Sequence, residues 1–228
     1  MGVNKEHKGK INLILGPMFS GKSSMLISRY NKYLLGGKKC IMVKYKGDIR
    51  YDTQKIVTHD GYKVNAVVCE NLYEIEHLVN DCEVICIDEV QFYKDAHIFS
   101  DKWANEGRII EACGLNGTFE RKPFDIISRL LPLVRHITYL TAVCRETGKD
   151  AIYSMRTTSE TKEEVIGGSE KYSAVDRYTY SKNVDTVEQN LSEFLEIYTS
   201  LHGNILVDKE IKEKIIHNFK SQERVAYL

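Results

Sequence analysis

The chain lacks most of the features that mark membrane, secreted and nucleic-acid-binding proteins. Lysine plus arginine and aspartate plus glutamate each number 32, so no net charge draws the chain to a polyanion. No apolar run approaches the about 20 residues that a membrane-spanning helix needs, and residues 1–8 are charged where a signal peptide would be apolar. We therefore expect a cytoplasmic protein with neither nucleic acid nor a membrane as partner.

The cysteines lack a pairing pattern. The six cysteines include no Cys-x-x-Cys pair, and some, such as Cys40 and Cys86, lie in apolar runs. That context is typical of small buried side chains in a reducing compartment rather than of a disulfide framework. With 228 residues, 43% of them hydrophobic, the chain is long enough for one ordinary domain and a modest appendage.

What the chain does have is a regular alternation of short apolar runs and longer amphipathic ones. The apolar runs, each a predicted strand, span residues 11–15, 40–43, 84–87, 109–113 and 137–143. The amphipathic runs, each a predicted helix, span residues 22–35, 72–80 and 96–106, and a polar loop is predicted over 46–61. Alternating strands and helices predict an α/β fold, with a parallel sheet covered by helices on both faces.

A phosphate-binding motif lies between the first predicted strand and helix. Residues 16–23 fit G-x-x-x-x-G-K-[ST], in which glycines let backbone N–H groups turn around phosphate oxygens. We expect Lys22 to reach the β- and γ-phosphates of ATP and the Ser23 hydroxyl to bind Mg²⁺. The candidate ATP-binding residues of this loop are Gly16, Pro17, Met18, Phe19, Ser20, Gly21, Lys22 and Ser23.

Two adjacent carboxylates end the predicted strand 84–87. A P-loop site needs an acidic residue at the end of a neighbouring strand to position the metal, and Asp88 is placed for that role. Glu89 should point the other way and is free for other work. If that work is accepting a proton from a substrate hydroxyl, the enzyme is a kinase.

The composition changes after Cys144. Residues 145–183 are polar and loop-like, and helical spacing of apolar residues returns from about 184, with a last helix near 208–219. We predict a P-loop nucleotide-binding domain over 1–143, a small subdomain over 144–183 and a helical C-terminal tail over 184–228.

Several segments, in order, resemble thymidine kinases of the cellular (type II) branch over roughly residues 10–180. They include LGPMFSGKS at 15–23, DEVQF at 88–92, GTFERKPF at 117–124, LTAVC at 140–144 and VIGGSEKY at 165–172. Shorter matches are VKY at 43–45 with Asp48 and Arg50, and THD at 58–60. The resemblance implies a RecA-like P-loop fold, a lasso-bearing subdomain and transfer of a phosphate from ATP to thymidine.

The resemblance also implies roles for individual residues. Glu89 would be the general base, Lys22 and Arg50 would offset phosphate charge, and Asp48 would orient Arg50 or act through metal-bound water. Asp88 and Gln91 are assigned to the ATP side. The residues assigned to the nucleoside are Met18, Asp48, Phe92, Leu115, Phe119, Ser154, Val165, Ile166, Gly167, Gly168 and Tyr172.

Within that set, Phe119 would stack on the thymine ring, and the backbone of 165–168 would hydrogen-bond to its edge. Met18, Leu115, Ser154 and Tyr172 would surround the 5-methyl group. One methyl in an apolar pocket is worth about 1–3 kcal/mol, so deoxyuridine should remain a substrate.

One departure concerns a structural zinc, which such kinases hold with two Cys-x-x-Cys pairs. At the matching positions this chain has Cys144, Thr147, Asp176 and Thr179. Threonine hydroxyls are poor zinc ligands, so we predict no structural zinc.

The resemblance implies a homotetramer, which nothing else in the sequence indicates. The alternatives are a P-loop deoxynucleoside kinase of different base preference and a non-catalytic ATP-binding module. A GTPase is disfavoured because the chain has no Asn-Lys-x-Asp motif, and a helicase because it needs a second motor domain.

Overall fold

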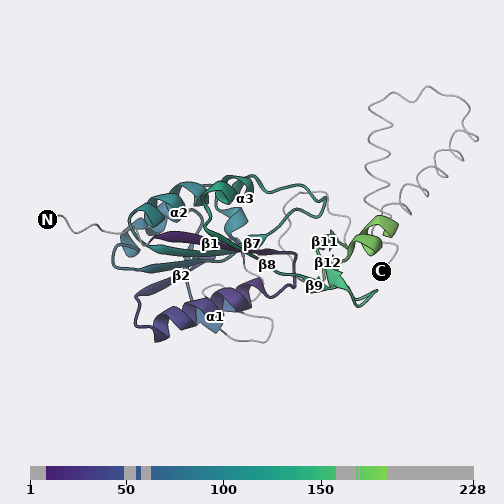
Figure 1. Ribbon diagram of the computed structural model, residues 1–228, viewed down its shortest axis with the longest axis horizontal. Coiled ribbons are helices and arrows are strands. Elements are labelled where there is room, and N and C mark those ends of the chain that lie inside the picture. Colours follow the sequence, from purple (N-terminus) through teal and green to yellow (C-terminus); the bar gives the residue numbers. More distant parts are fainter. Residues whose placement is uncertain (1–8, 49–54, 58–62, 158–167, 169, 184–228) are drawn as a thin grey trace, which may run out of the picture.

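A six-stranded parallel sheet forms the centre of the molecule (Figure 1). The structure is a computed structural model that describes residues 9–48, 55–57, 63–157, 168 and 170–183. The strand order is β5-β2-β6-β7-β1-β8. Their bounds are β1 Lys10–Gly16, β2 Cys40–Tyr45, β5 Val67–Cys69, β6 Val84–Ile87, β7 Ile109–Leu115 and β8 His136–Tyr139. The predicted α/β class with a parallel sheet is confirmed.

Helices cover both faces of this sheet, as predicted. Helix α1 (Lys22–Leu35) lies on one face, and α2 (Ala96–Asn105) and α3 (Asp125–Leu130) lie on the other (Figure 1). Strand β1 serves both layers, because Leu13 packs into the core beneath α2 and α3 while Ile14 packs beneath α1. The sheet residues are therefore apolar in both directions, which is why the strand runs show little alternation.

Several boundaries differ from the predicted ones. Residues 72–80 form no α-helix: η1 (Leu72–Leu78) is a 3-10 helix that a capping box of Asn71 and Glu74 begins. The predicted loop 46–61 contains β3 (Lys55–Val57), which pairs with β4 (Lys63–Asn65). The predicted strand 137–143 is divided, since β8 ends at Tyr139 and a separate strand follows. Short 3-10 turns, η2 (Val90–Phe92) and η3 (Leu131–Leu133), complete this part.

The small subdomain after the sheet contains strands, and all but the first of them lie in residues 145–183, where the sequence predicted loop. Strand β9 (Ala142–Val143) pairs with β10 (Asp150–Ala151), and β11 (Tyr153–Arg156) pairs with β12 (Tyr172–Val175). Residues 177–183 are helical. The subdomain has a core of its own, made by Ala142, Cys144, Ala151, Ala174, Val175 and Tyr180. The predicted helical tail, 184–228, lies outside the described residues.

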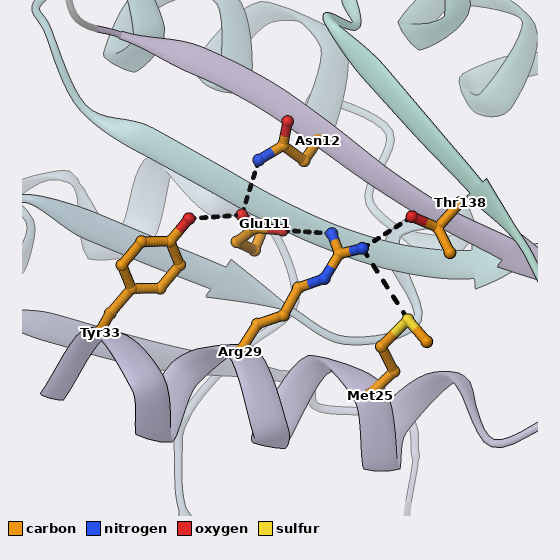
Figure 2. A network of polar contacts seen from close by, with 6 residues as sticks. All are labelled: Asn12, Met25, Arg29, Tyr33, Glu111 and Thr138. Atoms are coloured by element: carbon orange, nitrogen blue, oxygen red, sulfur yellow. Dashed lines mark hydrogen bonds and ion pairs between the residues drawn. The ribbon is translucent and has the colours of Figure 1, made fainter. Parts of the chain in front are cut away.

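A buried polar network fastens α1 to the sheet (Figure 2). Glu111 of β7 has a side chain that is only 2% exposed. Its carboxylate accepts hydrogen bonds from Asn12 at 2.6 Å and from Tyr33 at 2.8 Å, and it forms an ion pair with Arg29 at 2.7 Å. Arg29 also donates to the Thr138 hydroxyl at 2.7 Å. Burial, and then the hydrogen bond to Glu111, raise the pKa of Tyr33, so its hydroxyl stays a donor.

This network joins α1 to β1, β7 and β8 at once. Every charge in it has a partner, which a buried charge needs in order not to destabilise the fold. Because α1 begins at Lys22, the network fixes the helix whose first turn carries the phosphate motif.

Among the described residues, no helix combines the length and apolarity needed to cross a bilayer.

Candidate active site

The phosphate loop lies where the sequence placed it, between the end of β1 at Gly16 and the start of α1 at Lys22. Two of its glycines are required by geometry. A Cβ at Gly16 would lie 2.4 Å from the carbonyl oxygen of Leu140, and Gly21 has φ +81°. A side chain at Gly16 would therefore collide with the backbone, and one at Gly21 would be strained because left-handed backbone favours glycine.

The loop is joined to the end of β6 through a hydroxyl–carboxylate contact. Ser23 Oγ donates to Asp88 Oδ1 at 3.0 Å, so the two residues predicted to share a metal lie together. Lys22 is buried, and its Nζ donates to the carbonyl of Pro17 at 2.6 Å. This bond holds the Lys22 ammonium against the phosphate loop.

Cys113 contacts Asp88 as well, which the sequence did not reveal. Its Sγ donates to Asp88 Oδ1 at 2.8 Å. Burial, and next the nearby Asp88 carboxylate, raise the pKa of the Cys113 thiol well above its usual value. The thiol therefore stays neutral and remains a donor that orients Asp88.

Glu89 has a backbone conformation that is rare for its residue type. With φ 51° and ψ 46° it is left-handed, and it turns the chain from β6 into η2. Gln91 Nε2 donates to Glu89 Oε2 at 2.7 Å, and the backbone N–H of Leu115 donates to Gln91 Oε1 at 3.1 Å. A Cβ at Gly114 would lie 2.6 Å from that amide oxygen. Gln91, assigned above to ATP, thus holds the Glu89 carboxylate against β7.

Asp48 is buried beside the end of β2. Its carboxylate lies 3.2 Å from the ammonium of Lys44, and the two side chains are 6% and 4% exposed. Lys44 was not among the predicted site residues. Arg50, the expected partner of Asp48, lies outside the described residues, as do Val165, Ile166 and Gly167.

Four apolar residues from separate segments meet beside the phosphate loop. Met18, Phe119 and Tyr172 are buried together, and Leu115 packs against them. We call these four residues the aromatic wall. They are the residues that the resemblance assigned to the base, together with Ser154, whose hydroxyl accepts a hydrogen bond from the backbone N–H of Met18 at 2.9 Å.

Two further candidates lie outside this cluster. Phe92 stacks on Tyr45, with ring centroids 5.2 Å apart and planes 29° apart. Gly168 is buried, and its carbonyl accepts a hydrogen bond from the backbone N–H of Tyr172 at 3.1 Å. The described end of the 165–168 segment is therefore next to the wall.

Arg156 is the largest omission of the sequence analysis. It is 2% exposed, its guanidinium carbon lies 3.8 Å from the centroid of the Phe119 ring, and its Nη2 donates to the Tyr172 hydroxyl at 2.9 Å. The signal that could have found it is alternation, because Ser154 and Arg156 are the buried residues of β11.

The four positions compared with a zinc site do converge, but they are joined by hydrogen bonds. Asp176 accepts from the Thr147 hydroxyl and from the backbone N–H of Thr179, each at 2.7 Å. Cys144 Sγ lies 3.5 Å from Thr179 Oγ1. We call these four residues the clasp. Within the described residues, no group of three or more histidine, cysteine, aspartate or glutamate side chains could hold a metal ion.

Charge on the clasp follows from these contacts. Backbone and hydroxyl hydrogen bonds, from Thr179 first and then Thr147, lower the pKa of Asp176. Burial opposes ionisation of Cys144, but hydrogen bonds with Thr147 and Thr179 outweigh it and lower the pKa of this thiol to about 7. One thiolate and one carboxylate, already hydrogen-bonded, do not make the closed tetrahedral set that zinc requires.

A phosphate loop at the end of a parallel strand, followed by a helix and opposed by a strand-end carboxylate, defines an α/β P-loop protein. A second carboxylate, Glu89, follows at the next position and is held by Gln91, which is the arrangement expected of a P-loop kinase.

Comparison with known proteins specifies which kinase family. The sequence model of the family described as "Thymidine kinase" matches residues 9–180. A protein named thymidine kinase from Sheeppox virus (strain KS-1) is 46% identical over 172 residues, which are 75% of this chain and 97% of that protein. The thymidine kinases of Raccoon poxvirus and Variola virus are 45% and 44% identical over the same shares of each chain. The chain belongs to the thymidine kinase family and uses ATP as phosphate donor.

A solved structure, domain III of the Thermotoga maritima replication initiation protein DnaA, matches 94% of this chain and 86% of that one at 13% identity. Its TM-score is 0.34, a similarity too low to bear on the fold.

Proposed function

We propose that the chain transfers the γ-phosphate of ATP to the 5′-hydroxyl of thymidine, giving dTMP for DNA synthesis by nucleotide salvage. The observation that carries the proposal is the double position of Met18. It belongs to the phosphate loop and to the aromatic wall, so the phosphate donor and a planar acceptor would meet at one loop. The printed names of the viral relatives favour thymidine as that acceptor.

Charge at the phosphates would be offset by Lys22 and Arg50. Ser23 and Asp88 offer the hard oxygen ligands that Mg²⁺ prefers, and their 3.0 Å contact places both at one point. A bound Mg²⁺ supplies positive charge to the phosphate oxygens of ATP. Cys113 and Ser23, which both donate to Asp88, keep its carboxylate aimed at this point.

Glu89 would take the proton of the 5′-hydroxyl as that oxygen attacks the γ-phosphorus. The new bond joins the 5′-oxygen to the γ-phosphorus, and the bond from that phosphorus to the β–γ bridging oxygen breaks, which releases ADP. Gln91 supports this role because its amide holds the carboxylate in one orientation. Phosphoryl transfer depends mainly on such alignment and on charge neutralisation.

The base would be recognised by the aromatic wall and by the backbone of Val165, Ile166, Gly167 and Gly168. Phe119 would stack on the ring, Phe92 would line the pocket, and Asp48 would act at the sugar or phosphate side through Arg50. An apolar contact to one methyl group is worth about 1–3 kcal/mol, so deoxyuridine is a weaker substrate rather than a rejected one.

No structural zinc is part of the proposal. The clasp supports this, since Asp176 accepts two short hydrogen bonds from the chain positions where thiolates would be needed. Metal analysis of the purified chain tests it directly, with about one zinc per chain as the contradicting result. A homotetramer is proposed on the family resemblance alone.

Phosphorylation of a panel of nucleosides tests the proposed function. The purified chain with Mg-ATP is given thymidine, deoxyuridine, deoxycytidine, deoxyadenosine or deoxyguanosine, and monophosphate is measured by chromatography. We expect strong turnover of thymidine, weaker turnover of deoxyuridine and none of the others. Preference for another nucleoside would leave a kinase of different base preference, and no product at all would leave an ATP-binding module.

A further inference from the structure

Arg156 is a buried cation that sits behind the aromatic wall. It ends β11 directly opposite Tyr172 of β12, so the strand pairing alone brings the two side chains to one edge. Its guanidinium carbon lies 3.8 Å from the centroid of Phe119 and 5.4 Å from that of Tyr172. The 2.9 Å hydrogen bond to the Tyr172 hydroxyl fixes the second ring from its polar end.

These contacts determine the orientation of the rings. A guanidinium is flat and charged, so it stacks on one face of an aromatic ring and prevents that ring from tilting. A lysine ammonium has no plane to present and cannot reproduce this contact.

Arg156 also belongs to the same strand face as Ser154, which accepts from the backbone N–H of Met18. One short strand therefore contacts the phosphate loop at one residue and the stacking ring at another. The backbone carbonyl of Phe119 is fixed independently, by the Tyr180 hydroxyl at 3.1 Å. The backbone and the ring of Phe119 thus have separate supports.

We propose that Arg156 is a positioning residue for the nucleoside, acting through Phe119 and Tyr172, which it holds in the orientation that receives the base. This inference rests on the proposed function, which assigns those two rings to the base. Under this inference Arg156 influences the choice of nucleoside without having to contact the nucleoside itself. Binding of ATP at the phosphate loop should not depend on Arg156.

The test compares Arg156→Lys with Arg177→Lys. Arg177 is the matched control, because its guanidinium carbon lies 5.3 Å from the centroid of the Tyr153 ring in the same subdomain but its side chain is exposed. KM and kcat for thymidine and KM for ATP are measured. We expect Arg156→Lys to raise the thymidine KM about tenfold, equivalent to about 1.4 kcal/mol, with the ATP KM unchanged. Arg177→Lys should leave all three constants unchanged.

The same substitution in a Phe119→Leu background shows whether Arg156 acts through the ring. There Arg156→Lys should raise the thymidine KM by no more than about threefold, the part that acts through Tyr172, because coupled residues are not additive. A general structural role would instead give the same loss in both backgrounds. Such equal losses, or an unchanged or lower thymidine KM in Arg156→Lys, would overturn the inference.

A milder variant covers the case in which Arg156→Lys does not fold. Tyr172→Phe keeps the ring and removes only the oxygen bonded to Arg156, and it should raise the thymidine KM about threefold. No change would overturn the inference. If the unaltered chain made no dTMP, the proposed function would fail separately. The same variants would then be compared by calorimetric thymidine binding, and absence of binding to the unaltered chain would overturn both.

Discussion

The consecutive residues 16–23 make the phosphate loop, whereas the aromatic wall draws Met18, Leu115, Phe119 and Tyr172 from four separate segments. The loop is held by its own backbone geometry and by α1. The wall is held by side-chain contacts, among them that of Arg156, whose guanidinium carbon lies 3.8 Å from the centroid of the Phe119 ring. This difference separates two tasks: changes near the loop should affect every nucleoside equally, and changes behind the wall should alter the choice among nucleosides.

The largest effect should come from Glu89, the carboxylate proposed as the general base. Glu89→Gln removes the proton acceptor while keeping the shape and the neighbouring Gln91, so kcat should fall by about 10²–10⁴ for all nucleosides. ATP binding, measured by calorimetry, should be retained. Glu120→Gln, an exposed glutamate paired with Lys122, is the control. Unchanged turnover in Glu89→Gln would contradict its role as the base.

The buried network under α1 should matter for stability. Glu111→Gln leaves the Arg29 charge without its carboxylate, and breaking a buried pair in this way costs about 3–5 kcal/mol. Urea unfolding measures the loss. Glu83→Gln, which breaks an exposed pair with Lys38, should leave the free energy of unfolding almost unchanged. Similar losses in the two variants would mean that the network does not fasten the helix.

Gly114→Ala should reduce catalysis without changing the choice of base. The new Cβ would lie 2.6 Å from Gln91 Oε1, so the amide must shift and carry Glu89 with it. A misplacement of about 1 Å can cost about 100-fold in rate, and we expect a fall in kcat of about 10–100-fold. Gly36→Ala is the control, because Gly36 has φ −75° and its nearest atoms lie at 3.3 Å. Full activity in Gly114→Ala would mean that the position of Gln91 does not affect the rate of phosphate transfer.

The smallest effect should be seen at the clasp, in acid. Because the pKa of Asp176 is lowered in the folded chain, its stabilisation is complete above the unfolded value of about 3.9 and is lost as pH falls through the lower folded value. Asp176→Asn should therefore reduce the melting temperature at neutral pH and narrow its difference from the unaltered chain below about pH 4.

Asp150→Asn provides the comparison for the clasp, since its exposed carboxylate accepts a single hydroxyl bond from Thr141 at 3.2 Å. If the difference in melting temperature between the unaltered and Asp176→Asn chains does not become smaller in acid, the stabilising role given to the Asp176 carboxylate is contradicted. Replacing Thr147, Asp176 and Thr179 with cysteine should create binding of one zinc per chain, which we do not expect in the unaltered chain.

The phosphate-binding part of the site was predictable because its residues are neighbours in the sequence. A strand, a glycine loop and a helix follow one another around Lys22, and Asp88 directly follows an apolar strand. The sequence also named the members of the aromatic wall, through the family resemblance rather than through any local pattern. The structure brings those members together.

The supporting contacts were not predictable, because each depends on the pairing of distant strands. Cys113 reaches Asp88 because β6 and β7 are neighbours, and Arg156 reaches Phe119 because β11 places it there. At 72–80 the helical pattern failed because the chain closes into a short 3-10 helix, η1. The clasp positions were identified, but the hydrogen bonds that join them required coordinates.

The separation of tasks is tested most directly by the ratio of kcat/KM for thymidine to that for deoxyuridine, measured in the unaltered chain, in Gly114→Ala and in Phe119→Leu. We predict that Gly114→Ala lowers both values and leaves the ratio unchanged, whereas Phe119→Leu reduces the ratio. A ratio that changes in Gly114→Ala, or one that survives Phe119→Leu, would contradict the division between phosphate loop and aromatic wall.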